Sequence, residues 1–199
     1  PKGLFTKELE VALVKQKADL AVHSLKDLPT GLPAGLKLGA TPKREDVRDV
    51  LIYKNEAGFS GELQQIRKGG LIGTSSTRRE VQLRAVRSDL HFEEIRGNVP
   101  TRLEKLAEND DLDGTILAAA GLNRLGFTIS GDGFLKGDAV PDGIRAVALD
   151  TDIMLPCVGQ GAIGLEIRED DGRIEKIVER LNHFNTMTCV TAERSFLKS

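Results

Sequence analysis

Residues 71–107 read LIGTSSTRREVQLRAVRSDLHFEEIRGNVPTRLEKLA, and this stretch decides the fold class. Short apolar runs at 71–74 and 91–95 each lead into a segment with apolar residues at helical spacing. Residues 114–117 are followed by a helical pattern in the same way, which makes a third repeat of the order. Such alternation predicts an α/β domain whose strands are mostly parallel.

The rest of the chain carries further patterns of both kinds. Apolar spacing predicts helices at 4–14, 170–181 and 186–197, and strands at 18–22, 36–40, 49–53 and 162–167. Residues 41–48 are polar and charged, so we interpret them as a crossing between two domains. Residues 130–143 contain four glycines without apolar periodicity, which predicts a loop.

The composition argues against several classes of protein. No apolar run approaches the roughly 18 to 20 residues that a membrane helix needs, and Cys157 and Cys189 lack the spacing of a zinc site or a disulfide framework. The chain has no Trp and a single Tyr, and it lacks a sustained basic stripe for nucleic acid. We therefore expect a soluble globular protein of a reducing compartment, without a metal site.

Arginines gather at two of the predicted strand-to-helix junctions. Arg78 and Arg79 follow the first strand of the quoted stretch, and Arg96 and Arg102 flank the second junction. Backbone N–H groups at such a junction attract anions, and basic residues in a first helical turn oppose the helix dipole unless an anion is present. Both junctions also have the spacing of a capping box, at Thr77 with Glu80 and at Thr101 with Glu104.

Neighbouring parallel strands would bring both junctions to one edge of the sheet, where ligands of open α/β folds bind. Guanidinium groups grip carboxylates and phosphates in a bidentate fork. Walker A and GxGxxG motifs are absent from these turns, so we expect a ligand with several carboxylates. The alternative is that the arginines are solvated surface residues.

Asp27 lies just after the predicted strand at 18–22. At a strand end its carboxylate is able to face a cleft, but a turn-capping aspartate before Leu28–Pro29 is the alternative that the local sequence favours. We expect His23 to be a packed, hydrogen-bonded residue rather than a catalyst. Residues 156–161 form either a glycine turn near a ligand or a tight entry into the next strand.

Six segments together resemble the porphobilinogen deaminase family, in an order and spacing that cover nearly the whole chain. They are KGLFTKELE at 2–10, AVHSLKDLP at 21–29, GTSSTRR at 73–79, RGNVPTR at 96–102, LPCVGQG at 155–161 and VTAER at 190–194. The resemblance implies two periplasmic-binding-protein-like (type II) α/β domains with a cleft between them. Domain 1 would comprise residues 1–42 and 186–199, and domain 2 residues 43–185.

The resemblance also implies that the chain is a fragment. It would cover most of domains 1 and 2 and lack both the N-terminal strand and the third domain, whose cysteine carries the dipyrromethane cofactor. Neither Cys157 nor Cys189 occupies that motif, so we expect both to be packing residues. The stretch 127–152 is longer than the family leads us to expect.

In this family a cysteine-linked dipyrromethane primes the head-to-tail condensation of four porphobilinogen molecules, with loss of ammonia, to hydroxymethylbilane. The resemblance therefore implies a transferase of tetrapyrrole (heme or chlorophyll-type) biosynthesis, hydroxymethylbilane synthase, with porphobilinogen as its small-molecule partner and neither nucleic acid nor membrane. It implies a cytoplasmic monomer, and plastid targeting stays open because the N-terminus is missing. The truncated chain itself is expected to be inactive.

Individual positions also match the family's site residues. Asp27 matches the catalytic carboxylate, which stabilises pyrrole nitrogens as positive charge develops. The matches to arginines that bind the acetate and propionate side chains of cofactor and substrate are Arg78, Arg79, Arg96 and Arg102. The other matches to cofactor- or substrate-binding positions are Lys2, Ser24, Lys26, Thr74, Ser75, Ser76, Gly97, Asn98 and Arg168.

Two other functions stay open on the sequence. A binding module of the same two-domain architecture would hold a polycarboxylate ligand on the arginines without catalysis. In that case Asp27→Asn would leave ligand binding intact. A nucleic-acid-binding protein ranks third, and its affinity would fall steeply with salt.

Overall fold

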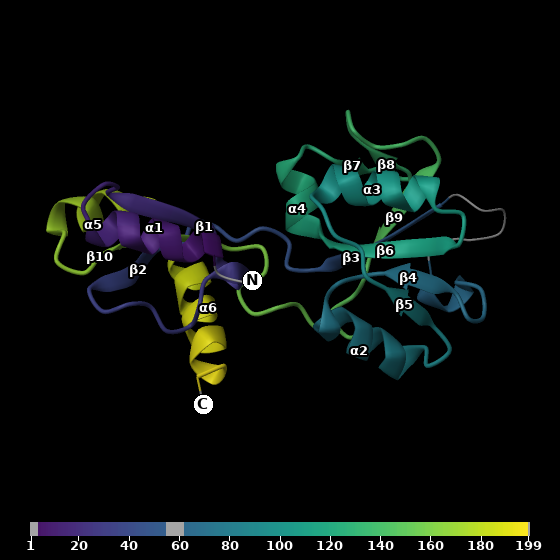
Figure 1. The fold of residues 1–199 in the computed structure, drawn as a ribbon, viewed down its shortest axis with the longest axis horizontal. Helices are drawn as coiled ribbons and strands as arrows, with labels where there is room; N and C mark the ends of the chain where they lie inside the picture. Colours follow the sequence, from purple (N-terminus) through teal and green to yellow (C-terminus); the bar gives the residue numbers. More distant parts are fainter. Residues whose placement is uncertain (1–3, 55–61, 199) are drawn as a thin grey trace. The chain divides into compact units, whose positions relative to one another are not determined.

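The computed structural model describes residues 4–54 and 62–198. The chain forms two compact units, of which unit 1 comprises residues 1–46 and 157–199 and unit 2 comprises residues 47–156. Each unit is built around its own sheet, and helices pack on the strands in both (Figure 1). The α/β class that the sequence predicts is therefore confirmed.

Unit 1 contains an antiparallel sheet with the strand order β1-β10-β2. Its strands are β1 (Leu20–Ser24), β2 (Leu36–Ala40) and β10 (Ile163–Arg168), and its helices are α1 (Leu4–Val14), α5 (Gly172–Glu179) and α6 (Phe184–Phe196), with a 3-10 helix, η1 (Leu25–Asp27), directly after β1. Ile174 and Val178 of α5 join Ile167 of β10 in one hydrophobic cluster, and Leu13 of α1 joins Ala21 of β1 in another. The sheet of unit 1 is therefore anchored by helices from both ends of the chain.

Unit 2 contains a five-stranded mixed sheet with the order β5-β4-β6-β3-β9. Its strands are β3 (Asp49–Lys54), β4 (Leu71–Gly73), β5 (His91–Glu93), β6 (Leu112–Ala118) and β9 (Ile144–Ala148). Its helices are α2 (Thr77–Val86), α3 (Val99–Glu108) and α4 (Ala119–Arg124), with a 3-10 helix, η2 (Leu63–Gln65), and a hairpin of β7 (Thr128–Ile129) and β8 (Leu135–Lys136). Strand β4 runs parallel to β5 and β6, whereas β3 is antiparallel to β6 and β9.

The helices of unit 2 cover both faces of its sheet (Figure 1). Helices α3 and α4 pack on one face through a cluster that includes Leu103 and Leu122, and α2 packs on the other face through Leu83. Successive residues of β3 point to opposite faces, so Ile52 belongs to the first cluster and Leu51 to the second. Burial on both faces explains why this strand is a continuous apolar run in the sequence.

The division of the chain differs from the predicted one. The sequence places residues 157–185 in domain 2, but they lie in unit 1 because β10 pairs with both β1 and β2. Residues 43–46 also lie in unit 1. These pairings join residues more than a hundred positions apart, for example Leu20 with Ile167, and local patterns carry no signal of them.

Two local predictions also need correction. The sequence predicts mostly parallel strands. Only the pairs β4–β5 and β4–β6 are parallel among the described strands, and the other pairs are antiparallel. The predicted loop at 130–143 contains β8, which pairs with β7 in a short hairpin. Two-residue strands are too short for apolar periodicity to reveal them.

The core of unit 2 provides a test of the fold. Leu51 is fully buried at the centre of the sheet, so Leu51→Ala should lower the free energy of unfolding by about 2 to 5 kcal/mol. Urea unfolding of the protein measures this change. Val81→Ala, at a side chain 60% exposed on α2, is the matched control and should change stability far less. Equal effects of the two substitutions would contradict the assigned core.

Candidate functional site

Asp27 lies at the end of the 3-10 helix η1, which turns the chain sharply after β1. Leu25 is buried, and its N–H donates to the carbonyl oxygen of Ala162 at 3.0 Å, while the N–H of Leu28 donates to Leu25 at 3.2 Å. With Leu25 anchored in the core, Ser24, Lys26 and Asp27 are exposed. Among the described residues no hydrogen bond ties the Asp27 carboxylate to the turn, so the turn-capping alternative gains no support.

Arg78 and Arg79 begin helix α2, and both bind the buried carboxylate of Asp49 on β3. Arg79 donates to Asp49 Oδ1 from Nε at 3.1 Å and from Nη2 at 2.7 Å, and its Nη1 donates to the carbonyl of Ile116 at 2.9 Å. Arg78 Nη2 donates to Asp49 Oδ2 at 2.7 Å. The two side chains differ in exposure, because Arg79 is buried whereas Arg78 is partly open to solvent. They are therefore not the solvated surface arginines of the alternative reading.

Asp49 is a site residue that the sequence patterns did not predict. This residue is fully buried and opens a strand that was recognised only as an apolar run. A charged residue at the start of such a strand is the signal that could have identified it, because a buried carboxylate requires a cationic or hydrogen-bonding partner.

The second junction, between β5 and α3, is shaped by Asn98. Its side chain accepts the N–H of Thr101 at 2.9 Å and so caps the helix. The residue before it, Gly97, has φ of +129°, and a Cβ there would lie 2.8 Å from the Thr101 Cγ2, so glycine is required. The predicted capping box at Thr101 with Glu104 is therefore wrong, because the helix begins two residues earlier.

The predicted capping box at Thr77 with Glu80 is also wrong. Thr77 is the first residue of α2, and the preceding Ser76 occupies the cap position without a side-chain hydrogen bond. The N–H of Ser76 instead donates a hydrogen bond to Thr74 Oγ1 at 3.2 Å. The turn before α2 is thus held by Thr74, which is itself buried.

The structure brings the two junctions together, as the sequence predicts. Ser75 Oγ donates to the carbonyl of Ile95 at 2.7 Å, and the N–H of Thr74 donates to Glu93 at 2.9 Å. Burial lowers the pKa of Arg102, and the positive charge of Arg79 lowers it further. Two cations thus disfavour each other at this edge of the sheet, and an anion bound there would relieve the repulsion.

Arg96 and Arg102 differ in their partners. Arg96 is exposed and pairs with Glu94, from Nη2 to Oε1 at 2.5 Å. Arg102 is partly buried, and its Nε donates to the neutral carbonyl of Gly97 at 2.8 Å. No carboxylate pairs with Arg102 within residues 4–54 and 62–198. Of the predicted arginines, Arg102 therefore carries the least neutralised charge.

Arg168 has a different environment from the other predicted site residues. Its Nη1 donates to the carbonyls of Leu13 and Ala18 at 3.0 and 2.7 Å, and its Nη2 pairs with Asp171 at 2.6 Å. These bonds fasten the end of α1 and the segment that follows it to the end of β10. Lys2, which the sequence also assigns to the site, lies outside the described residues.

His23 and Glu166 form a buried pair between β1 and β10. The distance from His23 Nε2 to Glu166 Oε2 is 2.9 Å, which confirms that His23 is a packed, hydrogen-bonded residue. The pKa of Glu166 is raised, first because burial disfavours its charged form, and the bond to His23 opposes this effect. The other charged groups that act on Glu166 are Glu10 on α1 and Arg194 on α6.

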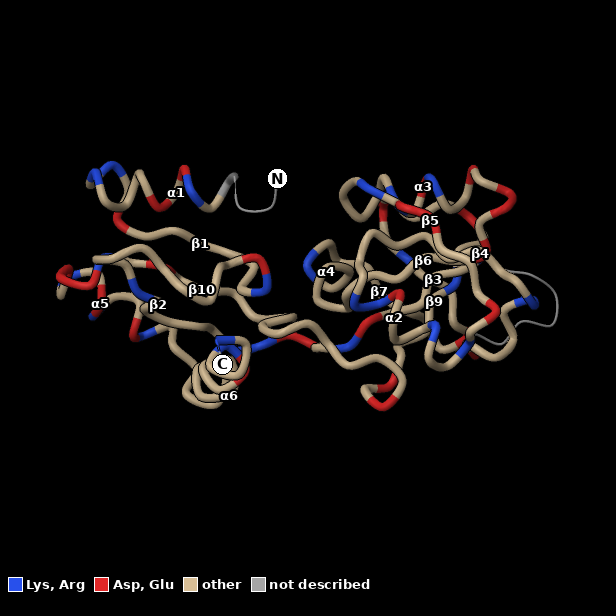
Figure 2. The backbone as a smooth tube through the Cα atoms, turned by 60° about the horizontal axis from the view of Figure 1, so that its bottom comes forward, with Lys and Arg blue, Asp and Glu red and all other residues tan. Residues whose placement is uncertain are grey.

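The two thiols are free, with Cys157 half-buried and Cys189 exposed on α6. Cys189 is therefore not the packing residue that the sequence analysis expects. Within the described ranges, no group of three or more His, Cys, Asp or Glu residues is placed to hold a metal ion. No helix of the described part of the chain is long and apolar enough to cross a membrane. Basic and acidic residues are interspersed along α1 and α3 (Figure 2).

The Asp49 cluster provides a second test. Asp49→Asn keeps the side-chain volume but removes the charge that pairs with two arginines, so the free energy of unfolding should fall by about 3 kcal/mol. Urea unfolding measures the loss. Glu94→Gln, which breaks the exposed pair with Arg96, is the matched control and should give no measurable change. A control effect as large as that of Asp49→Asn would refute a special role for the buried carboxylate.

The buried pair of unit 1 predicts a pH dependence. Because the folded protein raises the pKa of Glu166, folding favours its protonated form, and that contribution to stability is lost as pH rises through the folded pKa. Glu166→Gln imitates the protonated form at every pH. The variant should therefore gain stability relative to the unmodified protein as pH rises above about 4.3, the ordinary pKa of glutamate. Urea unfolding of both proteins over a pH series measures this difference, and a constant or falling difference would contradict it.

Comparison with known proteins identifies the family. The family model described as porphobilinogen deaminase, dipyromethane cofactor binding domain, matches residues 1–176. Porphobilinogen deaminase of Trichlorobacter lovleyi is 50% identical over 197 residues, which are 99% of this chain and 57% of that protein. Porphobilinogen deaminase of Bacillus velezensis is 48% identical over 196 residues, with 98% of this chain and 57% of that protein covered.

The chain thus spans about 57% of the length of these curated relatives. Among solved structures, the VFT2 domain of Bordetella pertussis BvgS aligns with a TM-score of 0.49 and 12% identity, over 94% of this chain and 72% of that chain. The family assignment depends on the family model, which covers most of the chain. This chain belongs to the porphobilinogen deaminase family.

Proposed function

We propose that the full-length protein containing this chain is hydroxymethylbilane synthase (porphobilinogen deaminase). It would join four porphobilinogen molecules head to tail, release four molecules of ammonia and consume one water to give hydroxymethylbilane. The observation that carries the proposal is the convergence of the two arginine-bearing junctions in a member of this family. There Arg79 lowers the pKa of the partly buried Arg102.

The charge at this edge suits the substrate. Porphobilinogen carries an acetate and a propionate side chain, and guanidinium groups bind carboxylates through paired N–H donors. We assign this binding first to Arg78 and Arg102, because Arg78 is partly exposed and Arg102 has only a neutral acceptor among the described residues. Arg79 would contribute mainly charge, since its donors already bind Asp49 and Ile116.

The same residues fit the family's dipyrromethane cofactor, because its side chains are also acetates and propionates. The positive charge of Arg79 disfavours that of the partly buried Arg102, and a bound polyanion would relieve this repulsion. Arg78, Arg96 and Arg102 would hold its carboxylates. When bound, the dipyrromethane supplies the pyrrole to which the first porphobilinogen is joined.

We assign Asp27 to the developing positive charge. In each condensation the C–N bond of the aminomethyl group breaks and ammonia leaves, so the pyrrole nitrogen of that unit becomes electron-poor. A carboxylate near this nitrogen accepts its N–H and stabilises the charge as it forms. Asp27 is exposed at the tip of an anchored turn, where a substrate is able to reach it, and Lys26 and Ser24 lie beside it.

We also place the reaction in the cytoplasm. Cys157 and Cys189 are both free thiols, which fits a reducing compartment.

Porphobilinogen consumption by the full-length protein tests the proposal. Asp27→Asn removes the charge that stabilises the transition state and should lower kcat by about a hundredfold or more. Asp170→Asn, an exposed aspartate of the same unit, is the matched control and should keep full activity. The 199-residue chain alone should show no turnover. A full-length protein that leaves porphobilinogen unchanged would exclude the proposed function and favour a carboxylate-binding module.

A further inference from the structure

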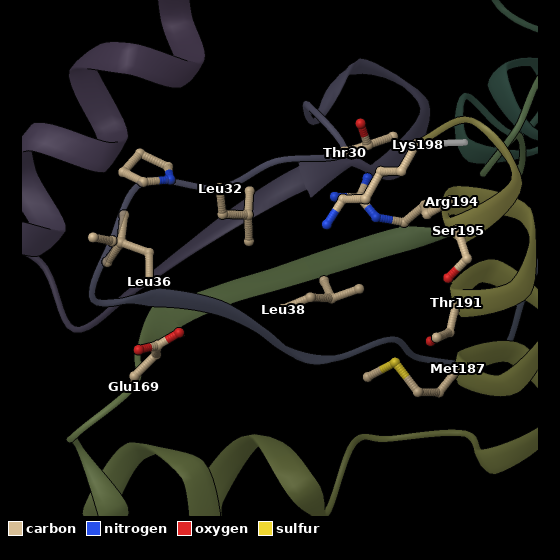
Figure 3. Close-up of a pocket in the computed structure, with 12 residues that line it drawn as sticks. Thr30, Leu32, Leu36, Leu38, Glu169, Met187, Thr191, Arg194, Ser195 and Lys198 are labelled. Carbon is tan, nitrogen blue, oxygen red and sulfur yellow. The ribbon is translucent and has the colours of Figure 1, made fainter.

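Two adjacent residues of α6, Glu193 and Arg194, bind backbone groups of two segments that contact each other at η1: Arg194 binds the residues after Asp27, and Glu193 binds Gly159. Arg194 Nη1 donates to the carbonyl of Leu28 at 3.0 Å, and its Nη2 donates to the carbonyl of Pro29. Figure 3 shows Arg194 reaching from α6 toward the segment that carries Thr30. One guanidinium therefore binds the carbonyls of the two residues that follow Asp27.

The preceding residue, Glu193, binds the segment that packs against η1. Its Oε2 accepts the N–H of Gly159 at 2.8 Å. Gly159 has φ of +70°, and a Cβ there would lie 3.2 Å from the backbone carbon of Leu25 and from the nitrogen of Lys26. The glycine turn at 156–161 is thus a close backbone contact under η1, which favours the tight-entry reading of this motif.

The burial of Arg194 is costly for a residue that only packs a helix. The side chain is about nine-tenths buried, and burial lowers its pKa, with only partial compensation from the negative charge of Glu166. Its hydrogen-bond acceptors are neutral carbonyls rather than a carboxylate. The apolar packing of α6 in this region is already provided by Val190, one turn earlier, which joins Leu25 and Leu28 in a hydrophobic cluster. What Arg194 adds is a fixed path for the backbone after Asp27.

We propose that Arg194 is a positioning residue for Asp27. The inference rests on the proposed function, in which the Asp27 carboxylate meets the charge that develops on a pyrrole. Arg194 does not contact the substrate in this scheme. Its planar fork binds two carbonyls at once, whereas a lysine ammonium concentrates its charge at one point and does not reproduce the fork.

A double-mutant cycle in the full-length protein tests the coupling. Arg194→Lys should lower kcat for porphobilinogen about tenfold and leave KM within about twofold, because displacement of a catalytic group by about 1 Å lowers rates strongly. In the background of Asp27→Glu, whose carboxylate is already displaced, Arg194→Lys should lower kcat by less than about threefold. Cys189→Ser, at an exposed position of the same helix, is the matched control.

Arg194→Ala should lower kcat further than Arg194→Lys, and circular dichroism shows whether each variant is folded. If Arg194→Ala does not fold, the cycle with Arg194→Lys decides alone. The inference is overturned if Arg194→Lys keeps the kcat of the unmodified protein, or if its loss is the same in both Asp27 backgrounds. An unmodified protein without turnover would instead refute the proposed function, and the inference with it.

Discussion

The carboxylate of Asp49 is the constraint on which the arrangement of unit 2 depends. It is fully buried at the start of β3 and binds both arginines that open α2. A buried carboxylate is tolerated only with compensating cations and hydrogen bonds. Because Arg79 also binds the carbonyl of Ile116 on β6, the same cluster joins two central strands to a helix. The position of Arg78 at the edge of the sheet follows from this buried anchor.

Unit 1 uses buried polar groups in a similar way. Leu25 fixes the start of the η1 turn through apolar contacts, while Arg194 fixes its end through two carbonyls. The His23–Glu166 pair joins the neighbouring strands β1 and β10. An exposed residue such as Asp27, for which we propose a catalytic role, then needs no side-chain hydrogen bonds to hold its place. Its carboxylate stays exposed because the groups that define its backbone are buried.

Local patterns in the sequence predicted the elements well and their long-range partners poorly. The strand-to-helix repeats at 71–125 and the arginine junctions were recognised, because each depends on residues close together in the chain. The packed state of His23 was also predicted, but its partner was not. The pairing of β10 with β1 and β2 depends on residues more than a hundred positions apart. Asp49 and Glu166 were not predicted either, because their partners are also distant in the sequence. Arg79 lies 30 positions from Asp49, and His23 lies 143 positions from Glu166.

The ion pairs of unit 2 locate the arginine surplus on which the proposed carboxylate site rests. Between residues 78 and 102 there are six arginines and four acidic residues. The acids Glu80, Asp89 and Glu94 neutralise Arg84, Arg87 and Arg96, and Glu93 binds Asn109.

Asp49 supplies one negative charge for Arg78 and Arg79 together, and Arg102 has a carbonyl in place of a carboxylate. Near the edge where the two junctions meet, three arginines thus face the single negative charge of Asp49. A solvated surface would not need to gather them at a partly buried position, whereas a site for carboxylates would. Once the internal ion pairs are subtracted, the arginine surplus of the sequence is confined to Arg78, Arg79 and Arg102.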